Sequence, residues 1–216
     1  MIKAVIFDMD GVIANTQKTH SALEVQILKR YGVDISPKEL EKRYAGVRVK
    51  QLFTEMLKDA PDKTYDVEAL VIEKRKRMME LANIGVEPIP GSPPLIKTLH
   101  EANFKLAIGS ASQENYVEKI TTSLGLRKYF EALSTGDMVE KGKPNPDIFL
   151  LAAKKLSVKP ENCLVIEDGV SGMIAAKKAG MKCIGLVEDK LEEYPTKNLV
   201  ESLSEITIAF IKSLDD

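Results

Sequence analysis

Two aspartates stand directly after a short apolar run near the start of the chain. Residues 5–7 are Val-Ile-Phe, and Asp8-Met9-Asp10-Gly11 follow them. A continuous apolar run of this length is typical of a parallel strand that is buried on both faces. Residues two apart in an extended chain point to the same side, and ligands of open α/β sheets bind beyond the carboxyl ends of the strands. The pattern predicts that Asp8 and Asp10 lie in an active site; the alternative is a strand followed by a simple Asp-Gly turn.

Two later apolar runs also end in polar residues. Ser110-Ala111-Ser112 follow the run at 105–109, and Glu167-Asp168-Gly169 follow the run at 163–166. Lys143 stands before a proline, just ahead of a segment with helical periodicity. If all these groups share one crevice, it contains carboxylates for a hard cation, a hydroxyl donor and an ammonium. Such a set suits a phosphate group.

These residue types suit phosphoryl transfer. Mg²⁺ is typically held by one or two carboxylates, water and substrate phosphate, and Asp8 and Asp168 can supply the carboxylates. An attacking carboxylate needs the charge of the phosphoryl group to be neutralised, which the metal, Lys143 and Ser110 can do. We therefore predict Asp8 as the nucleophile and Asp10 as the group that moves protons to and from the reacting oxygens.

The elements that must position these residues alternate along most of the chain. From about residue 16 to 83 the pattern is helical throughout, which predicts an inserted unit of about four helices; Ser36 followed by Pro37 reads as a helix start. The Pro- and Gly-rich segment at 88–94 is predicted to connect this helical unit back to the first unit. Helices are then predicted at 95–102, 114–124, 147–156, 170–179 and 205–214, and strands at 105–109, 132–134, 163–166 and 182–187. This order predicts an α/β fold with a doubly wound parallel sheet.

Composition and charge exclude several other classes of protein. The 216 residues are 44% hydrophobic and 29% charged, as in ordinary globular proteins, which excludes a disordered chain. Because 31 Lys and Arg nearly cancel 32 Asp and Glu, we expect neither a nucleic-acid nor a membrane partner. A monomer or weak homodimer is expected. Cys163 and Cys183 lie in apolar runs and read as buried thiols. No signal peptide or spanning segment is evident, so a cytoplasmic location is expected.

The four polar stretches together resemble the motifs of the haloacid dehalogenase (HAD) superfamily, in the family's order. The resemblance implies a Rossmann-like core at 1–14 and 85–216 and an α-helical cap of the first type at 15–84. Within this superfamily, the chain is similar to the group that contains β-phosphoglucomutase and phosphoglycolate phosphatase. By this resemblance Asp8 is nucleophile and metal ligand, and Asp10 is acid/base and binds the metal through its backbone carbonyl. The resemblance further implies that Ser110, Ala111 and Lys143 bind phosphate, and that Glu167 and Asp168 complete a Mg²⁺ site.

The cap must select the substrate, and its sequence leaves alternatives open. The candidate specificity residues are His20, Gly46, Arg48, Lys50, Lys76, Ser112 and Gln113. For His20 a local hydrogen bond at the hinge, and for the three cations a solvated surface, are equally open interpretations. Hinges are expected at 13–15 and 84–85.

The choice between phosphatase and mutase depends on the cationic contacts to a second phosphate. Val49 stands where a mutase of this group carries arginine, and Gln113 stands where it carries lysine. The sequence therefore favours a Mg²⁺-dependent phosphatase acting on a small phosphorylated metabolite, with a sugar phosphate preferred, through an aspartyl phosphate. A phosphosugar mutase is the alternative. A non-catalytic phosphoreceiver is a rival of another class, against which the helical insertion argues.

Overall fold

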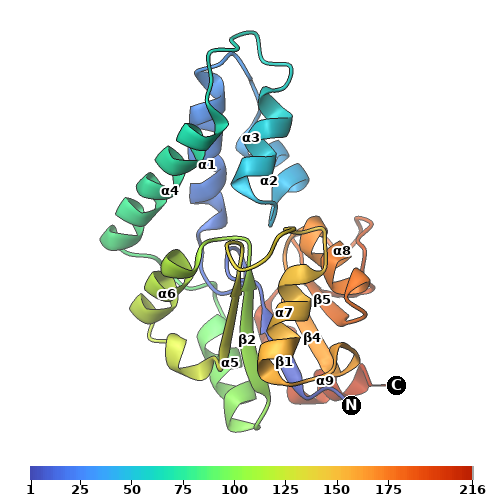
Figure 1. The fold of residues 1–216 in the computed structure, drawn as a ribbon. Coiled ribbons are helices and arrows are strands. Elements are labelled where there is room, and N and C mark those ends of the chain that lie inside the picture. Colours follow the sequence, from blue (N-terminus) through green and yellow to red (C-terminus); the bar gives the residue numbers. More distant parts are fainter. Residues whose placement is uncertain (216) are drawn as a thin grey trace.

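A six-stranded parallel sheet lies at the centre of the molecule (Figure 1), in a computed structural model that describes residues 1–215. The strands are β1 (Ala4–Phe7), β2 (Lys105–Ser110), β3 (Ala132–Thr135), β4 (Cys163–Glu167), β5 (Lys182–Leu186) and β6 (Asn198–Val200). Their order across the sheet is β3-β2-β1-β4-β5-β6. In the register, Val5 lies opposite Leu106 on one side and Leu164 on the other. The first strand is therefore central, as its apolar run predicts.

Helices cover both faces of this sheet. Val5 and Phe7 point into one core, which is covered by α5 (Ser92–Glu101), α6 (Glu114–Ser123) and α9 (Ile208–Ser213). Ala4 and Ile6 point into the other core, against α7 (Asp147–Leu156) and α8 (Val170–Lys178). All four strand residues have no exposed surface. The predicted doubly wound α/β fold is confirmed.

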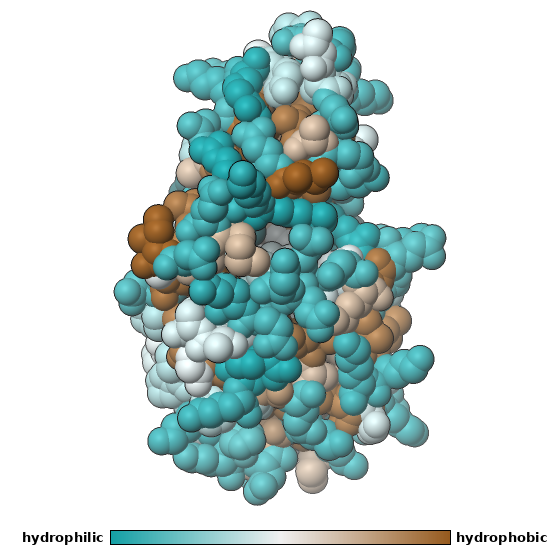
Figure 2. Space-filling model, turned by 60° about the vertical axis from the view of Figure 1, so that its left-hand side comes forward, coloured by the Kyte–Doolittle hydropathy of each residue, from teal (hydrophilic) through white to brown (hydrophobic). Residues whose placement is uncertain are grey.

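A helical cap stands over the carboxyl ends of the strands (Figure 1). It consists of α1 (Gln17–Lys29), α2 (Pro37–Tyr44), α3 (Val49–Leu57) and α4 (Val67–Ile84), and all four helices are inserted between β1 and α5. Ser36 caps α2 by accepting a hydrogen bond from the Glu39 backbone N–H at 3.2 Å, as its position before Pro37 predicts. Figure 2 shows that the face it draws is mostly hydrophilic over both cap and core, so the apolar sides of the helices are largely turned inward.

The two connections between cap and core lie side by side. The backbone N–H of Asn15 donates to the Glu87 carbonyl at 2.9 Å, and that of Ile89 donates to the Ile13 carbonyl at 2.9 Å. Gly85, at the end of α4, has a φ of +136°. These segments coincide with the hinges that we predict at 13–15 and 84–85; their movement remains a prediction.

The C-terminal part differs most from the sequence prediction. Strand β6 was not predicted, because three residues are too few to show a strand period. The last helix begins at Ile208 instead of 205, because Glu205 is tied back to the Ser202 backbone N–H at 2.9 Å in a capping box. Within residues 1–215, no helix combines the length and the apolar character that crossing a membrane requires.

Candidate active site

The predicted site residues meet where the central strands end under the cap. A pocket at this place is lined from the core by Asp8, Asp10, Ala111, Ser112, Gln113 and Tyr116, and from the cap by Gln17, His20, Glu24, Tyr44, Gly46, Arg48, Lys50, Lys74 and Arg75, among others. Ser110, Lys143 and Glu167 have no exposed surface and lie directly behind the two aspartates. The four polar stretches therefore come together, as the shared crevice in the sequence analysis requires.

Lys143 is enclosed between two carboxylates. Its Nζ donates to Asp8 Oδ1 at 2.5 Å and to Glu167 Oε1 at 2.6 Å, and it lies 4.9 Å from the centre of the Phe149 ring. Burial by itself would lower the pKa of Lys143, but the charges of Asp8 and Glu167 raise it above the ordinary value. Lys143 is therefore an ammonium. Lys141, the second lysine of the stretch, is exposed.

The acidic cluster carries more negative charge than the protein neutralises. Ligand oxygens of Asp8, Glu167 and Asp168 lie within 4.8 Å of one another. Burial raises the pKa of Asp8 to about 7, with Lys143 opposing this and Glu167 and Asp10 adding to it. Burial also raises the pKa of Asp168, again with Glu167 and Asp8 adding to the effect. Among the described residues, no cation other than Lys143 pairs with this cluster, so an oxygen-rich site for a hard dication fits the residues present.

Other contacts indicate which oxygens such a cation could reach. Both oxygens of Glu167 are engaged, one by Lys143 and the other by the Gly169 backbone N–H at 2.7 Å. In the part of the chain that the structure describes, the Asp10 backbone carbonyl accepts no hydrogen bond. Gly11 has a φ of +88°, and a Cβ there would lie 2.0 Å from Asp168 Oδ2. Glycine at this position lets the Asp168 carboxylate approach the first motif closely.

The Asp10 carboxylate is surrounded by three side chains, two from the start of α1 and one from the loop after β2. Thr16 Oγ1 donates to Asp10 Oδ1 at 2.6 Å, and Ser112 Oγ donates to Oδ2 at 3.0 Å. His20 Nε2 lies 3.2 Å from Oδ1. Burial alone would raise the pKa of Asp10, but the positive charge that His20 carries when it is protonated lowers it, as do the hydrogen bonds from Thr16 and Ser112. The sequence does not mark Thr16 as a site residue, because a single threonine before a helix is typical of an ordinary N-cap.

The cationic partner of His20 in the pocket is Lys74, two residues before the predicted specificity residue Lys76. Lys74 Nζ lies 2.6 Å from His20 Nδ1 and 3.0 Å from Glu24 Oε1. An ammonium only donates, so Nδ1 accepts and the ring proton of His20 lies on Nε2, toward Asp10. Lys76 is exposed and does not line the pocket. In the run Lys74-Arg75-Lys76-Arg77 each residue is basic, so the sequence does not show which of them faces inward.

Of the three other cap cations that line the pocket, Arg75 is exposed and has no ion pair within residues 1–215, whereas Arg48 and Lys50 have their charged groups engaged elsewhere. The Arg48 guanidinium donates to the backbone carbonyls of Glu140 at 2.7 Å, Gly136 at 2.5 Å and Val139 at 2.5 Å, all in the core loop that leads to Lys143. Lys50 forms an ion pair with Glu68 on α4. The charged groups of both residues thus bind other parts of the protein, and the role of these residues in substrate selection stays a prediction.

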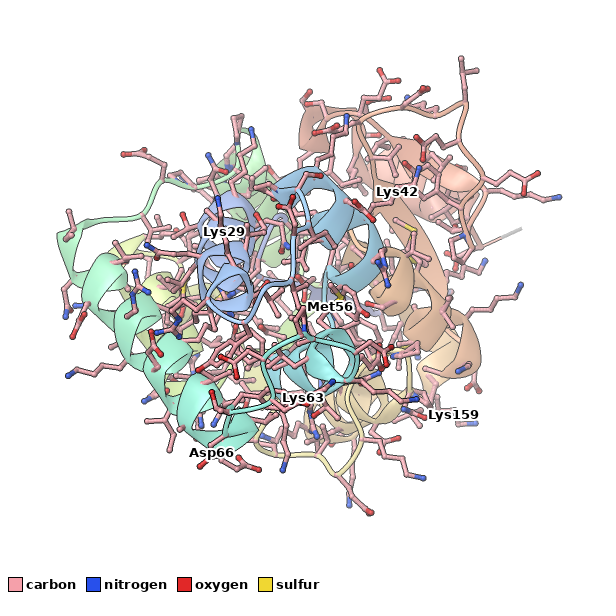
Figure 3. The ribbon with its side chains drawn as sticks, turned by 90° about the horizontal axis from the view of Figure 1, so that it is seen from above. Lys29, Lys42, Met56, Lys63, Asp66 and Lys159 are labelled. Atoms are coloured by element: carbon pink, nitrogen blue, oxygen red, sulfur yellow. The ribbon has the colours of Figure 1, made fainter. Side chains whose placement is uncertain are left out.

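The loop that carries Gly46 packs directly on the core. Ser171 Oγ donates to the Ala45 carbonyl at 2.5 Å, and a Cβ at Gly46 would lie 3.4 Å from Lys143 Cδ. Farther out, Lys42 on α2 pairs with Glu192 of the core at 3.0 Å; Figure 3 shows Lys42 beside the C-terminal part of the core. These contacts hold the cap against the core.

The fold and the acidic strand ends define an α/β enzyme with a helical cap. Residues 5–186 match the family model of the haloacid dehalogenase-like hydrolases, and the chain belongs to this family. A relative from Escherichia coli (strain K12), fructose-1-phosphate phosphatase YqaB, is 34% identical, with 83% of this chain and 93% of the relative covered.

Two solved structures share the arrangement of core and cap. CbbY from Rhodobacter sphaeroides, in complex with phosphate, has a TM-score of 0.84 and 28% identity, with 98% of this chain and 100% of that chain covered. The β-phosphoglucomutase of Clostridium difficile has a TM-score of 0.83 and 26% identity, with 99% and 96% covered. The chain is thus similar to both a phosphatase and a mutase of this family, and the resemblance on which the sequence analysis relies is confirmed.

Proposed function

We propose that this enzyme is a Mg²⁺-dependent phosphatase that hydrolyses a small phosphorylated metabolite, with sugar phosphates as the preferred class. The observation that carries the proposal is the placement of Asp8 in contact with Lys143, with Asp10 two residues away in a separate set of hydrogen bonds. The name of the Escherichia coli relative, a fructose-1-phosphate phosphatase, supports the substrate class.

In the first step a carboxylate oxygen of Asp8 attacks the phosphorus, and the bond to the alcohol oxygen of the substrate breaks. Lys143 and the Ser110 hydroxyl offset the negative charge of the transferring group. Mg²⁺, bound by Asp8, Asp168 and the Asp10 carbonyl, would supply further positive charge there. Since Lys143 bridges Asp8 and Glu167, we assign Glu167 mainly to holding the lysine in place.

Asp10 supplies the proton that the leaving alcohol needs. The bound phosphoryl group places negative charge near Asp10, and a nearby like charge raises the proton affinity of a carboxyl group. In the second step water attacks the aspartyl phosphate on Asp8, Asp10 takes a proton from that water, and inorganic phosphate leaves. His20 and Thr16 orient the Asp10 carboxylate for both transfers.

Hydrolysis is favoured over a mutase reaction by the contacts of the cap cations. A mutase must hold a bisphosphate at both ends, which calls for charged groups on the cap side of the pocket. Here the Arg48 guanidinium contacts three core carbonyls, Lys50 pairs with Glu68, and Lys74 pairs with Glu24. Gln113 is uncharged, which leaves Arg75 as the one pocket-lining cap cation whose charged group has no hydrogen bond or ion pair within residues 1–215. A single exposed cation is a weak site for the second phosphate of a bisphosphate. A mutase remains the second candidate because the fold is similar to that of a β-phosphoglucomutase.

A substrate screen tests this proposal. Purified protein with Mg²⁺ is assayed for phosphate release from a panel of sugar and polyol phosphates, and β-glucose 1-phosphate with a bisphosphate primer is assayed for glucose 6-phosphate. Phosphate release is expected to dominate. Glucose 6-phosphate formation faster than phosphate release would favour the mutase, and a stable phosphoprotein without turnover would favour the phosphoreceiver.

A further inference from the structure

Tyr116 is a buried tyrosine in the pocket to which neither the motifs nor the proposed reaction gives a role. It lies in the first turn of α6, shortly after the Ser110 motif, and only 6% of its surface is exposed. It lines the pocket together with Asp10 and His20. Its ring packs edge-on against the His20 ring, with 5.8 Å between the centroids and an interplanar angle of 77°. The ring is thus fixed in place by the side chain that also contacts Asp10.

The Tyr116 hydroxyl has no hydrogen-bond partner within residues 1–215, yet it is not sealed inside the protein. No donor or acceptor of the described chain lies within hydrogen-bond geometry of it, and it is not among the buried polar atoms that lack a partner. The hydroxyl therefore retains some solvent access, and the side chain that carries it lines the pocket. Buried tyrosines usually satisfy this group, so an unpartnered phenol in a substrate pocket indicates a partner supplied by the ligand.

The protonation and position of the phenol limit what it can bind. Burial raises the pKa of Tyr116, and the nearby Asp10 carboxylate raises it further, so the phenol is protonated and both donates and accepts. A neutral donor and acceptor matches a hydroxyl better than a second phosphate, which needs positive charge. Tyr116 lines the same pocket as Asp10, and the Asp10 charge acts on its phenol. With Asp10 at the ester oxygen, as proposed, a phenol on this wall of the pocket can reach the carbons next to that oxygen.

We propose that Tyr116 is a specificity-determining residue that hydrogen-bonds a hydroxyl on the carbon adjacent to the phosphate-bearing carbon of the substrate. The inference rests on the proposed phosphatase function and narrows its substrate to vicinal hydroxyalkyl phosphates, the class to which many sugar and polyol phosphates belong. A substrate without this hydroxyl would leave the phenol desolvated and unpaired, and polar groups left in this way are the strongest basis for rejecting an analogue.

A pair of substrates that differ in one hydroxyl tests the assignment. The rate constant kcat/KM is measured for 1,2-propanediol 1-phosphate and for n-propyl phosphate with the wild-type protein and with Tyr116→Phe. We expect the wild type to prefer the diol phosphate about tenfold, the value of one neutral hydrogen bond, and Tyr116→Phe to lose this preference. In Tyr116→Phe we expect kcat/KM to fall for the diol phosphate and to change little for n-propyl phosphate.

Tyr129→Phe is the matched control. Tyr129 also packs edge-on against a histidine, His100, with 5.3 Å between the centroids, but it lies outside the pocket. Its substitution should leave the preference unchanged, and thermal melts should show that both variants are folded. A preference that persists in Tyr116→Phe, or a wild type that cleaves both esters equally well, would overturn the role of Tyr116 while leaving the phosphatase proposal intact. If the wild type releases phosphate from no ester at all, including p-nitrophenyl phosphate, the proposed function itself fails.

Discussion

At the scale of single residues, Lys143 is the group whose surroundings differ most from those of an ordinary lysine. Its ammonium contacts Asp8 and Glu167 with no exposed surface on any part of the side chain. Removing one partner of a buried ion pair leaves the others uncompensated, which typically destabilises a protein more than the intact pair stabilises it. Lys143 should therefore matter for stability as well as for catalysis.

We expect Lys143→Met to lower the free energy of unfolding by about 3 kcal/mol in the absence of metal, because two buried carboxylates lose their cation. Lys141→Met is the matched control: Lys141 is exposed, so its substitution should change stability by less than about 0.5 kcal/mol. Urea unfolding of the three proteins measures both values. Equal stability of Lys143→Met and wild type would show that the lysine does not neutralise the cluster.

The sequence predicts that the motif residues lie close together, which the structure shows, but it does not reveal the side chains that surround Asp10. Asp8, Ser110 and Asp168 follow buried strands, so the topology alone brings them together. Thr16 directly precedes α1 and Lys74 lies in α4, and the positions of both helices relative to Asp10 depend on how the whole cap packs. No local spacing encodes that placement, which is why such residues emerge only from the three-dimensional structure.

At the scale of elements, the loop between α2 and α3 joins the cap to the core through Arg48. Its guanidinium donates to three backbone carbonyls of the loop at 136–140. A Cβ on Gly142 would lie 2.7 Å from Arg48 Cγ. The arginine stem thus fits against the core only because residue 142 is glycine. Since cap closure excludes water and completes the site, this contact should stabilise the closed form.

We expect Arg48→Ala to lower kcat/KM for a sugar phosphate about tenfold by favouring the open cap, and Gly142→Ala to act in the same direction. Arg43→Ala is a matched control, because the exposed Arg43 of α2 contacts Glu39 and the Tyr44 ring, both within the cap, and forms no ion pair or hydrogen bond with the core in residues 1–215. Steady-state kinetics of phosphate release compare the four proteins. Unchanged kinetics in Arg48→Ala would mean that the carbonyl contacts do not hold the cap.

Elements were predictable wherever hydrophobic periodicity extends over several residues. Helix α7 runs over Asp147–Leu156, as predicted, and the four cap helices were all anticipated. Strand β6 was not, because its pairing with β5 is a tertiary contact of only three residues. The start of α9 was placed too early because Glu205 suits a helix start by composition but accepts hydrogen bonds from the preceding turn.

At the scale of the whole molecule, the acidic cluster couples stability to pH and to metal. Asp8 has its pKa raised to about 7 by burial, from an ordinary value of 3.8. A carboxyl group with a raised pKa in the folded state binds its proton more tightly there than in the unfolded chain. Its contribution to stability is therefore fully present below the ordinary pKa and is lost as the pH rises through about 7. Asp168, with a pKa also raised by burial, acts in the same direction.

We therefore expect the melting temperature of the metal-free protein to rise when the pH is lowered from about 8 to about 6. Mg²⁺ should raise the melting temperature more at the higher pH, because it binds the deprotonated carboxylates. Differential scanning fluorimetry with Mg²⁺ or with a chelator measures both effects, and Asp8→Asn should weaken them. A Mg²⁺ effect that is equal at both pH values, or larger at the lower one, would contradict the proposed site.

The role of Asp8 as nucleophile is the central claim, and chemical trapping of the phosphorylated residue tests it most directly. The enzyme is mixed with Mg²⁺ and a sugar phosphate that it hydrolyses, and the reaction is quenched in acid. Reduction with borohydride then converts an aspartyl phosphate to homoserine. Peptide mass spectrometry should find homoserine at position 8 in the wild type, and neither homoserine nor phosphate release in Asp8→Asn. Homoserine at another aspartate, or phosphate release by Asp8→Asn at the wild-type rate, would contradict the assignment.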